Sequence, residues 1–363
     1  MPRIPASWSE VGFYEAFERL KLKPFEIPTK EYKVSGAYPI IDQGDGEIAG
    51  YIDREGPITN LPLIIFGDHT TIIKYVNQPC FIGSQGVVPL KARECYDPYF
   101  LYLMLGRTRI PALGYSRHFR ELENKTFPLP PLAEQRKIAE ILRTWDEAIE
   151  TAEAELKAKQ ERKRVLMKGL FSQKDGRQAC DSRPITEIAD LSKERPQGAE
   201  IVCVDFEHIS PETCQLIGSH PVRGDEVSKY RFKNGDVLFA KLRPYLKKAW
   251  LSDREGICSS EFWVFRAKTD KGDPGFIRQF VLSEPFLEAC AASSGSKMPR
   301  ADWSHVEKVK FYLPPLSEQS AIAVILQAAD AEIETNNKLI MLLRDQKRGL
   351  MQKLLTGDVR VAA

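Results

Sequence analysis

Two long stretches of the chain place apolar residues at alternating spacings of four and three, which is the pattern of a coiled-coil helix. One stretch carries these positions from Ile138 to Leu170, and the other carries them from Ile322 to Leu354. A pair of prolines precedes each stretch, and proline disfavours a helical conformation in the residue before it, so neither helix starts earlier. The pattern predicts two helices of about 33 residues, each about 50 Å long at 1.5 Å per residue.

The two stretches are copies of one another. Residues 127–170 match residues 311–354 without a gap, and both segments contain Leu-Pro-Pro-Leu-x-Glu-Gln just before the helix. Identities recur throughout the match, for example Asp146 with Asp330 and Lys163 with Lys347. A repeat of this length indicates that the chain consists of two similar halves, each ending in the same long helix.

The charge pattern favours an antiparallel pair of these helices within one chain. The first helix is acidic from Asp146 to Glu155 and mostly basic from Lys157 to Lys168, and the second has the same polarity. Antiparallel pairing therefore sets acidic halves against basic halves, whereas a parallel homodimeric zipper, the alternative, sets like charges together. Polar residues at seam positions, such as Asn336 and Lys159, weaken a generic zipper but specify its register.

Composition sets broad limits. The chain has 363 residues, enough for two domains with cores of their own, and a net charge of only +2, so any site for a polyanion is local. Seven dispersed cysteines without a CxxC pair indicate reduced thiols in a cytoplasmic protein, and five dispersed histidines give no metal-ligand spacing, so no metal site is expected. Neither a signal peptide nor a membrane span is expected from the apolar segments.

Ahead of each helix lies a segment that reads as a mixed α/β domain. The expected organisation is a first domain at 1–128, a helix at 129–172, a linker at 173–184, a second domain at 185–312, and a second helix with its tail at 313–363. The expected local elements are strands at 63–66 and 71–76 joined by a turn, a β-hairpin over 230–243 with its turn at 234–236, and one amphipathic helix per domain at 99–105 and 275–287.

The duplicated helix entry behind two domains resembles the specificity subunit of type I restriction–modification systems. Further resemblance lies in Gly-x-Tyr-Pro-Ile-Ile-Asp-Gln-Gly at 36–44, Phe-Gly-Asp-His-Thr at 66–70, Gly-Asp-Val-Leu-Phe-Ala-Lys at 235–241 and Cys-Ser-Ser-Glu-Phe at 258–262. It covers essentially the whole chain. The resemblance implies an α/β (α+β) fold with a pseudo-two-fold internal repeat, in which two target-recognition domains are separated by two long helices that form an antiparallel coiled coil.

The resemblance also implies a function for the assembly. Each domain would read one half of a bipartite, asymmetric site in double-stranded DNA. Two methyltransferase subunits would dock on the chain, and endonuclease subunits, which are also translocases, would join them for cleavage. The chain itself would be non-catalytic and without a cofactor, with S-adenosylmethionine, ATP and Mg²⁺ expected on the partner subunits.

The residues independently allow DNA binding. Seven cations and four aromatic residues lie between Lys229 and Lys248 against one acid, a composition suited to phosphate contacts, although a solvated hairpin face is the alternative. Arg243 is a candidate for bidentate recognition of guanine. His69 either contacts a base or phosphate or bonds to its own turn. The candidate DNA-binding residues are Gln43, His69, Thr70, Lys74, Arg117, Arg120, Lys229, Arg231, Lys241, Arg243, Tyr245, Lys247, Lys248, Lys297 and Arg300.

Two alternatives place the chain in other classes. An autonomous DNA methyltransferase is suggested by Asp97-Pro98-Tyr99-Phe100, which lacks the second proline of the amino-methyltransferase motif, and by the poor glycine loop at 81–86. A coiled-coil scaffold that does not bind DNA is the other alternative, and it would show no salt-dependent affinity for DNA.

Overall fold

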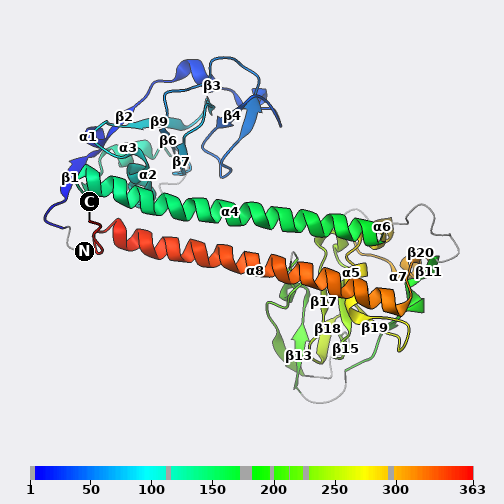
Figure 1. Ribbon diagram of the computed structural model, residues 1–363. Coiled ribbons are helices and arrows are strands. Elements are labelled where there is room, and N and C mark those ends of the chain that lie inside the picture. The colour runs from blue at the N-terminus through cyan, green and yellow to red at the C-terminus, as the bar shows by residue number, and fades with distance from the viewer. Residues whose placement is uncertain are drawn as a thin grey trace. The chain divides into compact units, whose positions relative to one another are not determined.

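The computed structural model describes residues 5–111, 116–171, 182–196, 200–211, 213–223, 229–292 and 298–362. By its contacts the chain divides into two compact units, one formed by Met1–Glu150 with Met341–Ala363 and the other by Thr151–Ile340. Each unit contains a mixed α/β domain and parts of two long helices, α4 (Leu132–Phe171) and α8 (Leu316–Leu354) (Figure 1). The α/β class predicted from the sequence is confirmed.

The long helices begin one residue after the paired prolines and are longer than predicted, with 40 residues in α4 and 39 in α8. A glutamine in the first turn of each helix holds this start in place. The side-chain amide of Gln135 donates to the carbonyl of Pro130 at 2.8 Å, and that of Gln319 donates to the carbonyl of Pro314 at 2.9 Å. The same residue in each copy thus satisfies a carbonyl that the helix itself cannot reach.

The two long helices run antiparallel, as the charge pattern predicts. In the first unit Asp146 of α4 pairs with Lys347 of α8, and in the second unit Lys163 of α4 pairs with Asp330 of α8. These residues are equivalent positions of the repeat, so one contact is made twice with the roles of the helices exchanged. Such reciprocity is what a two-fold relation between identical surfaces requires.

Polar seam residues contact one another rather than disrupt the packing. Asn336 is only 2% exposed, and its amide donates to the carbonyl of Ala152, its own equivalent in the first helix, at 2.7 Å. Lys159 donates to the Asn336 amide oxygen at 2.6 Å. Because this set of bonds exists in one register only, it specifies the alignment of the two helices in the second unit.

The first domain contains two four-stranded sheets and a two-stranded ribbon. One sheet has the order β2-β9-β6-β7 (Phe17–Arg19, Val87–Ala92, Leu63–Gly67, Ile73–Val76), and the other has the order β3-β8-β4-β5 (Glu26–Ile27, Phe81–Gly83, Tyr38–Ile41, Gly50–Ile52). The ribbon pairs β1 (Ser9–Gly12) with β10 (Thr126–Leu129), and the helices are α1 (Phe13–Ala16), α2 (Pro98–Arg107) and α3 (Phe119–Glu123).

The second domain has the same kinds of sheet. Their orders are β12-β19-β16-β17 (Ala189–Ser192, Phe262–Ala267, Val237–Ala240, Ala249–Leu251) and β14-β13-β18-β15 (His220–Arg223, Glu200–Val204, Gly256–Ser259, Lys229–Phe232). A ribbon pairs β11 (Ser182–Pro184) with β20 (Lys310–Tyr312), and the helices are α5 (Pro274–Phe280), α6 (Glu284–Ala292) and α7 (Trp303–Val306).

The repeat therefore extends from the long helices into the domains. The sheet β2-β9-β6-β7 has its counterpart in β12-β19-β16-β17, and in both sheets all neighbours are antiparallel. In the other sheets, β8 and β18 occupy the same place, but the edge strand differs: β3 runs parallel to β8, whereas β15 runs antiparallel to β18. The two domains share a framework and differ at one sheet edge.

Each domain core contains residues from both long helices. In the first unit Ile138 and Leu142 of α4 are buried in one cluster with Leu354 of α8. In the second unit Phe171 at the end of α4 packs against rings of α5, and Leu326 of α8 belongs to the same cluster. The helices are therefore structural parts of the domains and not free connectors.

Two expected elements are wrong in part. The strands expected around the turn at 234–236 exist, but they do not form a hairpin, because β15 pairs with β18 whereas β16 pairs with β17 and β19. The turn links two sheets, with Gly235 at a φ of 86°. The helix expected at 275–287 is divided into α5 and α6, which begins at Glu284 with Pro285 in its first turn. The strand pair β6–β7 and helix α2 are confirmed.

Candidate nucleic-acid interface

In the first domain, the turn between β6 and β7 lies against the segment that precedes α3. The backbone carbonyl of Asp68 accepts from the amide of His118 at 2.8 Å, and the Asp68 carboxylate accepts from the amide of Phe119 at 2.9 Å. The imidazole Nδ1 of His69 lies 3.3 Å from the carbonyl oxygen of Ser116. The turn and the segment therefore form one continuous surface, held together mainly through Asp68.

Gln43 supports this surface from a neighbouring loop. Its side-chain oxygen accepts from the backbone amide of His69 at 3.1 Å, and its carbonyl accepts from the hydroxyl of Thr70 at 2.7 Å. Gly86 leaves room for it, because a Cβ added there would lie 2.4 Å from the Gln43 amide nitrogen. Gln43, His69 and Thr70 are thus brought together as one polar group.

The three cations expected in this domain have different surroundings. Arg117 has an 83% exposed side chain with its Nε 3.9 Å from the Asp68 carboxylate, and Arg120 is exposed on α3. The Lys74 ammonium is instead enclosed and donates to the carbonyl of Gly46 at 2.5 Å. Burial lowers the pKa of Lys74. Arg117 and Arg120 can therefore face a polyanion, whereas Lys74 holds β7 against the loop at 42–46.

The second domain repeats this arrangement with different residues. The loop between β16 and β17 is bonded to the segment that precedes α7. The amide of Arg243 donates to the carbonyl of Pro299 at 2.7 Å, and the amide of Ala301 donates to the carbonyl of Lys241 at 2.9 Å. In both domains the equivalent connection, β6–β7 or β16–β17, therefore lies against the equivalent segment, before α3 or α7. The sequences of these connections and segments differ between the two domains.

The backbone of this second loop directs its side chains outward. Arg243 and Lys247 have φ angles of 49° and 54°, and they flank a 3-10 turn at Pro244–Leu246. Non-glycine residues seldom adopt this left-handed conformation, which recurs at functional sites. The side chains of Arg243, Tyr245 and Lys247 are exposed. Among the described residues, the Arg243 guanidinium has no hydrogen-bond or ion-pair partner.

Most of the other cations of the same sequence cluster are engaged within the fold, whereas Lys241 is half-buried and is bonded through its backbone. The Lys248 ammonium is buried, donates to the carbonyl of Phe206 at 2.7 Å and lies 4.0 Å above the Phe206 ring, and burial lowers its pKa. On β15, Lys229 contacts Cys203, and Arg231 pairs with Glu255 at 3.0 Å. The cations between residues 229 and 248 therefore do not form one basic face.

Arg300 lies in the pre-helix segment of the second domain, beside the exposed loop. Its guanidinium makes a two-pronged pair with Glu261 at 3.0 and 3.1 Å, and this carboxylate raises the pKa of Arg300. Arg300 therefore fixes the segment to the connection between β18 and β19, in addition to adding charge. Lys297 lies outside the described residues.

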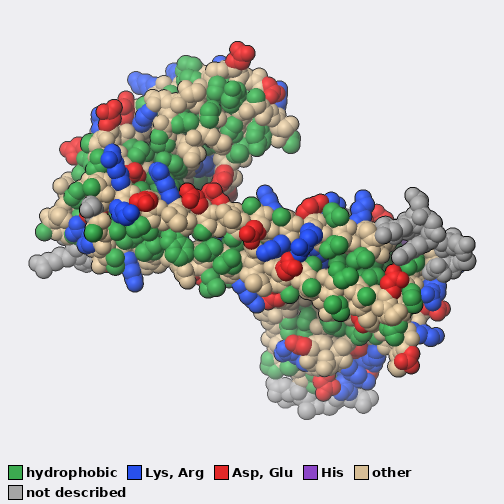
Figure 2. All heavy atoms as spheres, in the orientation of Figure 1, with side chains coloured by type: hydrophobic (Ala, Val, Ile, Leu, Met, Phe, Trp, Pro, Cys, Tyr) green, Lys and Arg blue, Asp and Glu red, His purple; other side chains and the backbone are tan. Residues whose placement is uncertain are grey.

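The long helices carry charges of both signs on the face that is seen in Figure 2. Figure 2 shows Lys and Arg side chains intermingled with Asp and Glu along both of them. Some of these form pairs, such as Arg162 with Glu332.

The segment that resembles a methyltransferase motif has a structural role. Asp97 is the N-cap of α2, where its carboxylate accepts from the amide of Phe100 at 2.8 Å, and Asp273 caps α5 in the same way at 2.9 Å. The side-chain oxygens of Gln135 and Gln319 each accept from the amide of the capping aspartate at 3.0 Å. The Asp-Pro pair thus joins the domain helix to the long helix in both halves, which explains its presence without catalysis.

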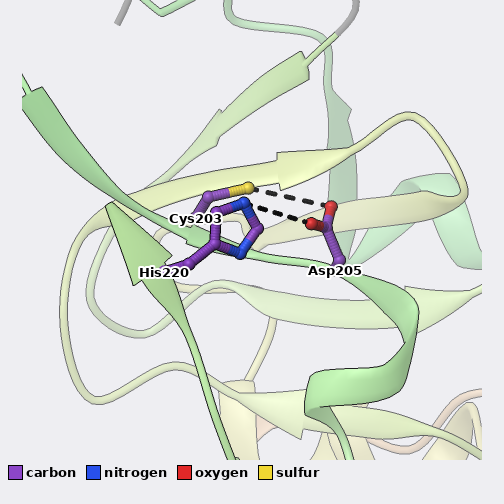
Figure 3. A group of neighbouring side chains, drawn as sticks. All are labelled: Cys203, Asp205 and His220. Carbon is purple, nitrogen blue, oxygen red and sulfur yellow. Dashed lines mark hydrogen bonds and ion pairs between the residues drawn. The ribbon is translucent and has the colours of Figure 1, made fainter. Parts of the chain in front are cut away.

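One further cluster gave no signal in the sequence. Cys203, Asp205 and His220 converge in the second domain, although His220 follows the other two on a different strand (Figure 3). Only the alternation of side chains along β13 and the pairing of β13 with β14 bring them to one face. No metal site was expected because that pairing cannot be read from spacing.

Comparison with known proteins decides the family. The model of the type I restriction modification DNA specificity domain matches residues 17–160 and 221–344, which together make up most of the chain. The chain belongs to this family. No helix in the described part of the chain has the length and apolar character of a membrane span.

Relatives of the chain include specificity subunits of type I restriction enzymes. The chain is 24% identical to the MjaVIII specificity subunit of Methanocaldococcus jannaschii over 99% of this chain and 94% of that protein. It is 26% identical to the Escherichia coli EcoDI specificity subunit over 42% of this chain and 34% of that protein. The crystal structure of the type I S subunit from M. genitalium has the same fold, with a TM-score of 0.64, 13% identity, and 98% and 97% of the two chains covered. Membership of a specificity-subunit family agrees with the expectation of a non-catalytic chain.

Proposed function

We propose that this specificity-family chain binds double-stranded DNA through two surfaces, one in each domain. The first surface is the β6–β7 turn with the segment at 116–120, supported by Gln43. The second is the loop at 241–247 with the segment at 298–301. Each surface reads one half of a bipartite site, and two methyltransferase subunits dock on the chain, with endonuclease subunits joining them for cleavage.

The observation that carries this proposal is the repeated juxtaposition of the same two segments in both domains. In the first domain they meet through Asp68, and in the second they meet through the backbone bonds of Lys241 and Arg243. A binding surface formed by loops on a rigid framework is the usual location of recognition residues. The framework recurs, whereas the exposed side chains differ, as expected of two surfaces that read different base pairs.

The exposed residues divide into those that contribute affinity and those that contribute specificity. Lys247 and Arg117 are exposed cations suited to phosphate contacts, which carry no base information. Arg243 is suited to the O6 and N7 atoms of guanine, because its fork of donors has no partner among the described residues and can make a bidentate contact. Catalytic cofactors, namely S-adenosylmethionine, ATP and Mg²⁺, are assigned to the partner subunits.

Sequencing the methylated adenines of cells that express this chain with its methyltransferase partner tests the proposal. We expect a two-part, asymmetric motif with an unread spacer. A contiguous motif, or a methylation pattern that does not depend on this chain, would contradict the assignment of bipartite recognition.

Binding measurements on the assembled chain and methyltransferase separate the roles of the cations. Lys247→Ala should weaken binding to every sequence and reduce the slope of log affinity against log salt by about 0.9. Arg243→Ala should relax discrimination at one base pair by about 1–3 kcal/mol. Arg254→Ala is a control, because Arg254 pairs with its neighbour Asp253 away from the loop. If all three variants have the same DNA affinity, salt slope and base discrimination, the interface must lie elsewhere on the chain.

A further inference from the structure

Three potential metal ligands lie on one face of the sheet formed by β14, β13, β18 and β15. β13 and β14 pair antiparallel with Cys203 opposite His220, and directly opposed residues project to the same face. Asp205 follows Cys203 by two positions in an extended conformation, so its side chain also projects to that face. Figure 3 shows the thiol, the carboxylate and the imidazole converging.

The distances among the ligand atoms suit a tetrahedral ion. The Cys203 sulfur lies 3.7 Å from one Asp205 oxygen, the His220 Nε2 lies 3.5 Å from the other, and one ligand atom from each residue lies within 4.8 Å of the others. Zinc bonds of about 2.3 Å to sulfur and about 2.0–2.2 Å to nitrogen or oxygen imply separations of roughly 3.3–3.6 Å between tetrahedral ligands. Small side-chain movements therefore suffice to complete the site.

We propose that Cys203, Asp205 and His220 bind a divalent transition-metal ion of the zinc class, with water as the fourth ligand. A sulfur, a nitrogen and an oxygen donor suit zinc, whereas magnesium and calcium prefer oxygen donors alone. His208 supports the site as an outer partner. Its Nδ1 accepts from the backbone amide of Asp205 at 2.9 Å, and its ring lies 5.3 Å from that of His220.

A cation already lies against these ligands. The Lys229 ammonium is 2.9 Å from the Cys203 sulfur and 3.9 Å from the Asp205 carboxylate. The ligand set therefore attracts positive charge, and a metal ion must displace this ammonium. Lys229 is the first residue of β15, and the group to be displaced is the end of its side chain and not the backbone of the sheet.

The consequence of metal binding would be a firmer second recognition surface. Asp205 leads into the 3-10 turn at Phe206–His208, and the carbonyl of Phe206 accepts from Lys248 at the end of the exposed loop. An ion that joins β13 to β14 at Asp205 would therefore hold the turn on which this loop rests. This consequence rests on the proposed function, whereas the metal site itself does not.

Metal titration of the full-length chain, reduced, metal-free and without a polyhistidine tag, tests the site. Zn²⁺ is titrated in competition with a chromophoric chelator, and Co²⁺ reports thiolate coordination by its charge-transfer and d–d absorption. We expect one ion per chain at this site and a rise of Tm on zinc addition. Cys203→Ser and His220→Ala should each lower the affinity more than about 100-fold, since even outer partners of metal ligands contribute roughly 10–100-fold.

Matched variants control for the loss of a cysteine or a histidine outside the cluster. Cys95→Ser and His305→Ala, at residues outside the cluster, should leave zinc binding unchanged. Lys229→Met should tighten zinc binding severalfold, because it removes the competing cation, and it tests the site even if a ligand variant fails to fold. The proposal is overturned if zinc binding is insensitive to Cys203→Ser and His220→Ala, or if Lys229→Met weakens it. Loss of DNA binding with intact zinc binding would count against the proposed function alone.

Discussion

Replacing Asp330 by asparagine should destabilise the second unit strongly, because one carboxylate compensates two enclosed cations. Asp330 on α8 pairs with Lys163 of α4 and accepts from Arg278 at 2.9 Å and from the amide of Gln279 at 2.7 Å. The side chains of Lys163 and Arg278 are only 16% and 13% exposed. Without the carboxylate both charges remain in a poorly hydrated site.

The expected loss of stability is about 3 kcal/mol. Removing one partner of a buried pair costs about 3–5 kcal/mol, and the lower end applies because water still reaches part of the Asp330 side chain. For a unit of this size, 1 kcal/mol corresponds to a change in Tm of roughly 2–4 °C, so Tm should fall by roughly 6–12 °C.

Calorimetric unfolding of the two variants Asp330→Asn and Glu332→Gln provides the measurement and its control. Glu332 lies on the same helix and also pairs with α4, through Arg162, but both side chains of that pair are about half exposed. Exposed pairs contribute about 0.2–1 kcal/mol, so Glu332→Gln should change Tm little. If Asp330→Asn lowers Tm no more than Glu332→Gln does, the argument from burial is wrong.

The same carboxylate predicts a pH dependence. Burial alone would raise the pKa of Asp330, but Lys163 and Arg278 outweigh it and hold the pKa below its ordinary value. An unfolded aspartate has a pKa of about 3.9, so the stabilisation is complete above that pH and is lost as the pH falls through the lower pKa of the folded state. Urea unfolding from pH 7 to pH 3 should show the difference between the native chain and Asp330→Asn shrinking at the acidic end. A constant difference would contradict the assignment.

Three further predictions follow from other contacts. Gln319→Ala should lower Tm by several degrees in thermal unfolding, because three hydrogen bonds of a buried side chain are lost. Its amide nitrogen donates to the carbonyls of Lys271 and Pro314, and its amide oxygen accepts from the backbone amide of Asp273. Lys248→Met should leave the salt dependence of DNA binding unchanged and stability within about 1 kcal/mol, since this ammonium is buried; a reduced salt slope would show that it contacts phosphate. Under the proposed function, one heptad added to each long helix, after residues 152 and 336, lengthens each by about 10 Å and should widen the unread spacer by about three base pairs in methylome sequencing.

The long helices were predictable because their signals are local. Two prolines mark each start, and the apolar seam shows which face is covered, so α4 and α8 begin close to the expected residues. The antiparallel direction followed from the polarity of charge, and the pairs Lys163–Asp330 and Lys347–Asp146 confirm it. The length was underestimated because the seam was taken as the limit of the helix, whereas α4 begins at Leu132 and α8 at Leu316, six residues before the first seam positions Ile138 and Ile322.

The strand pairing and the contacts of the Lys and Arg side chains could not be predicted from local signals. The turn at 234–236 is visible in the sequence, but the partners of β15 and β16 are β18 and β19, which lie more than twenty residues further along the chain. Likewise the basic composition of 229–248 does not show that Glu255 pairs with Arg231 or that Phe206 encloses Lys248. Such contacts depend on which strands pair over long distances in the chain, and the local pattern of apolar and polar residues does not specify that pairing.

The two domains share a framework but differ in their exposed loops, and under the proposed function this difference argues for an asymmetric DNA site. The framework repeats at equivalent residues, as Gln135 and Gln319 show by accepting from the backbone amides of the aspartates that cap α2 and α5, each at 3.0 Å. The exposed connections do not repeat, since residues 68–72 offer an imidazole and a hydroxyl, whereas the longer loop at 241–248 offers a guanidinium, a phenol and an ammonium. Under the proposed function, a framework that holds two loops in equivalent places, with different donors on each, would present two different patterns to two stretches of a groove. The two half-sites should therefore differ in sequence, and a palindromic motif would contradict this reasoning more directly than any single substitution.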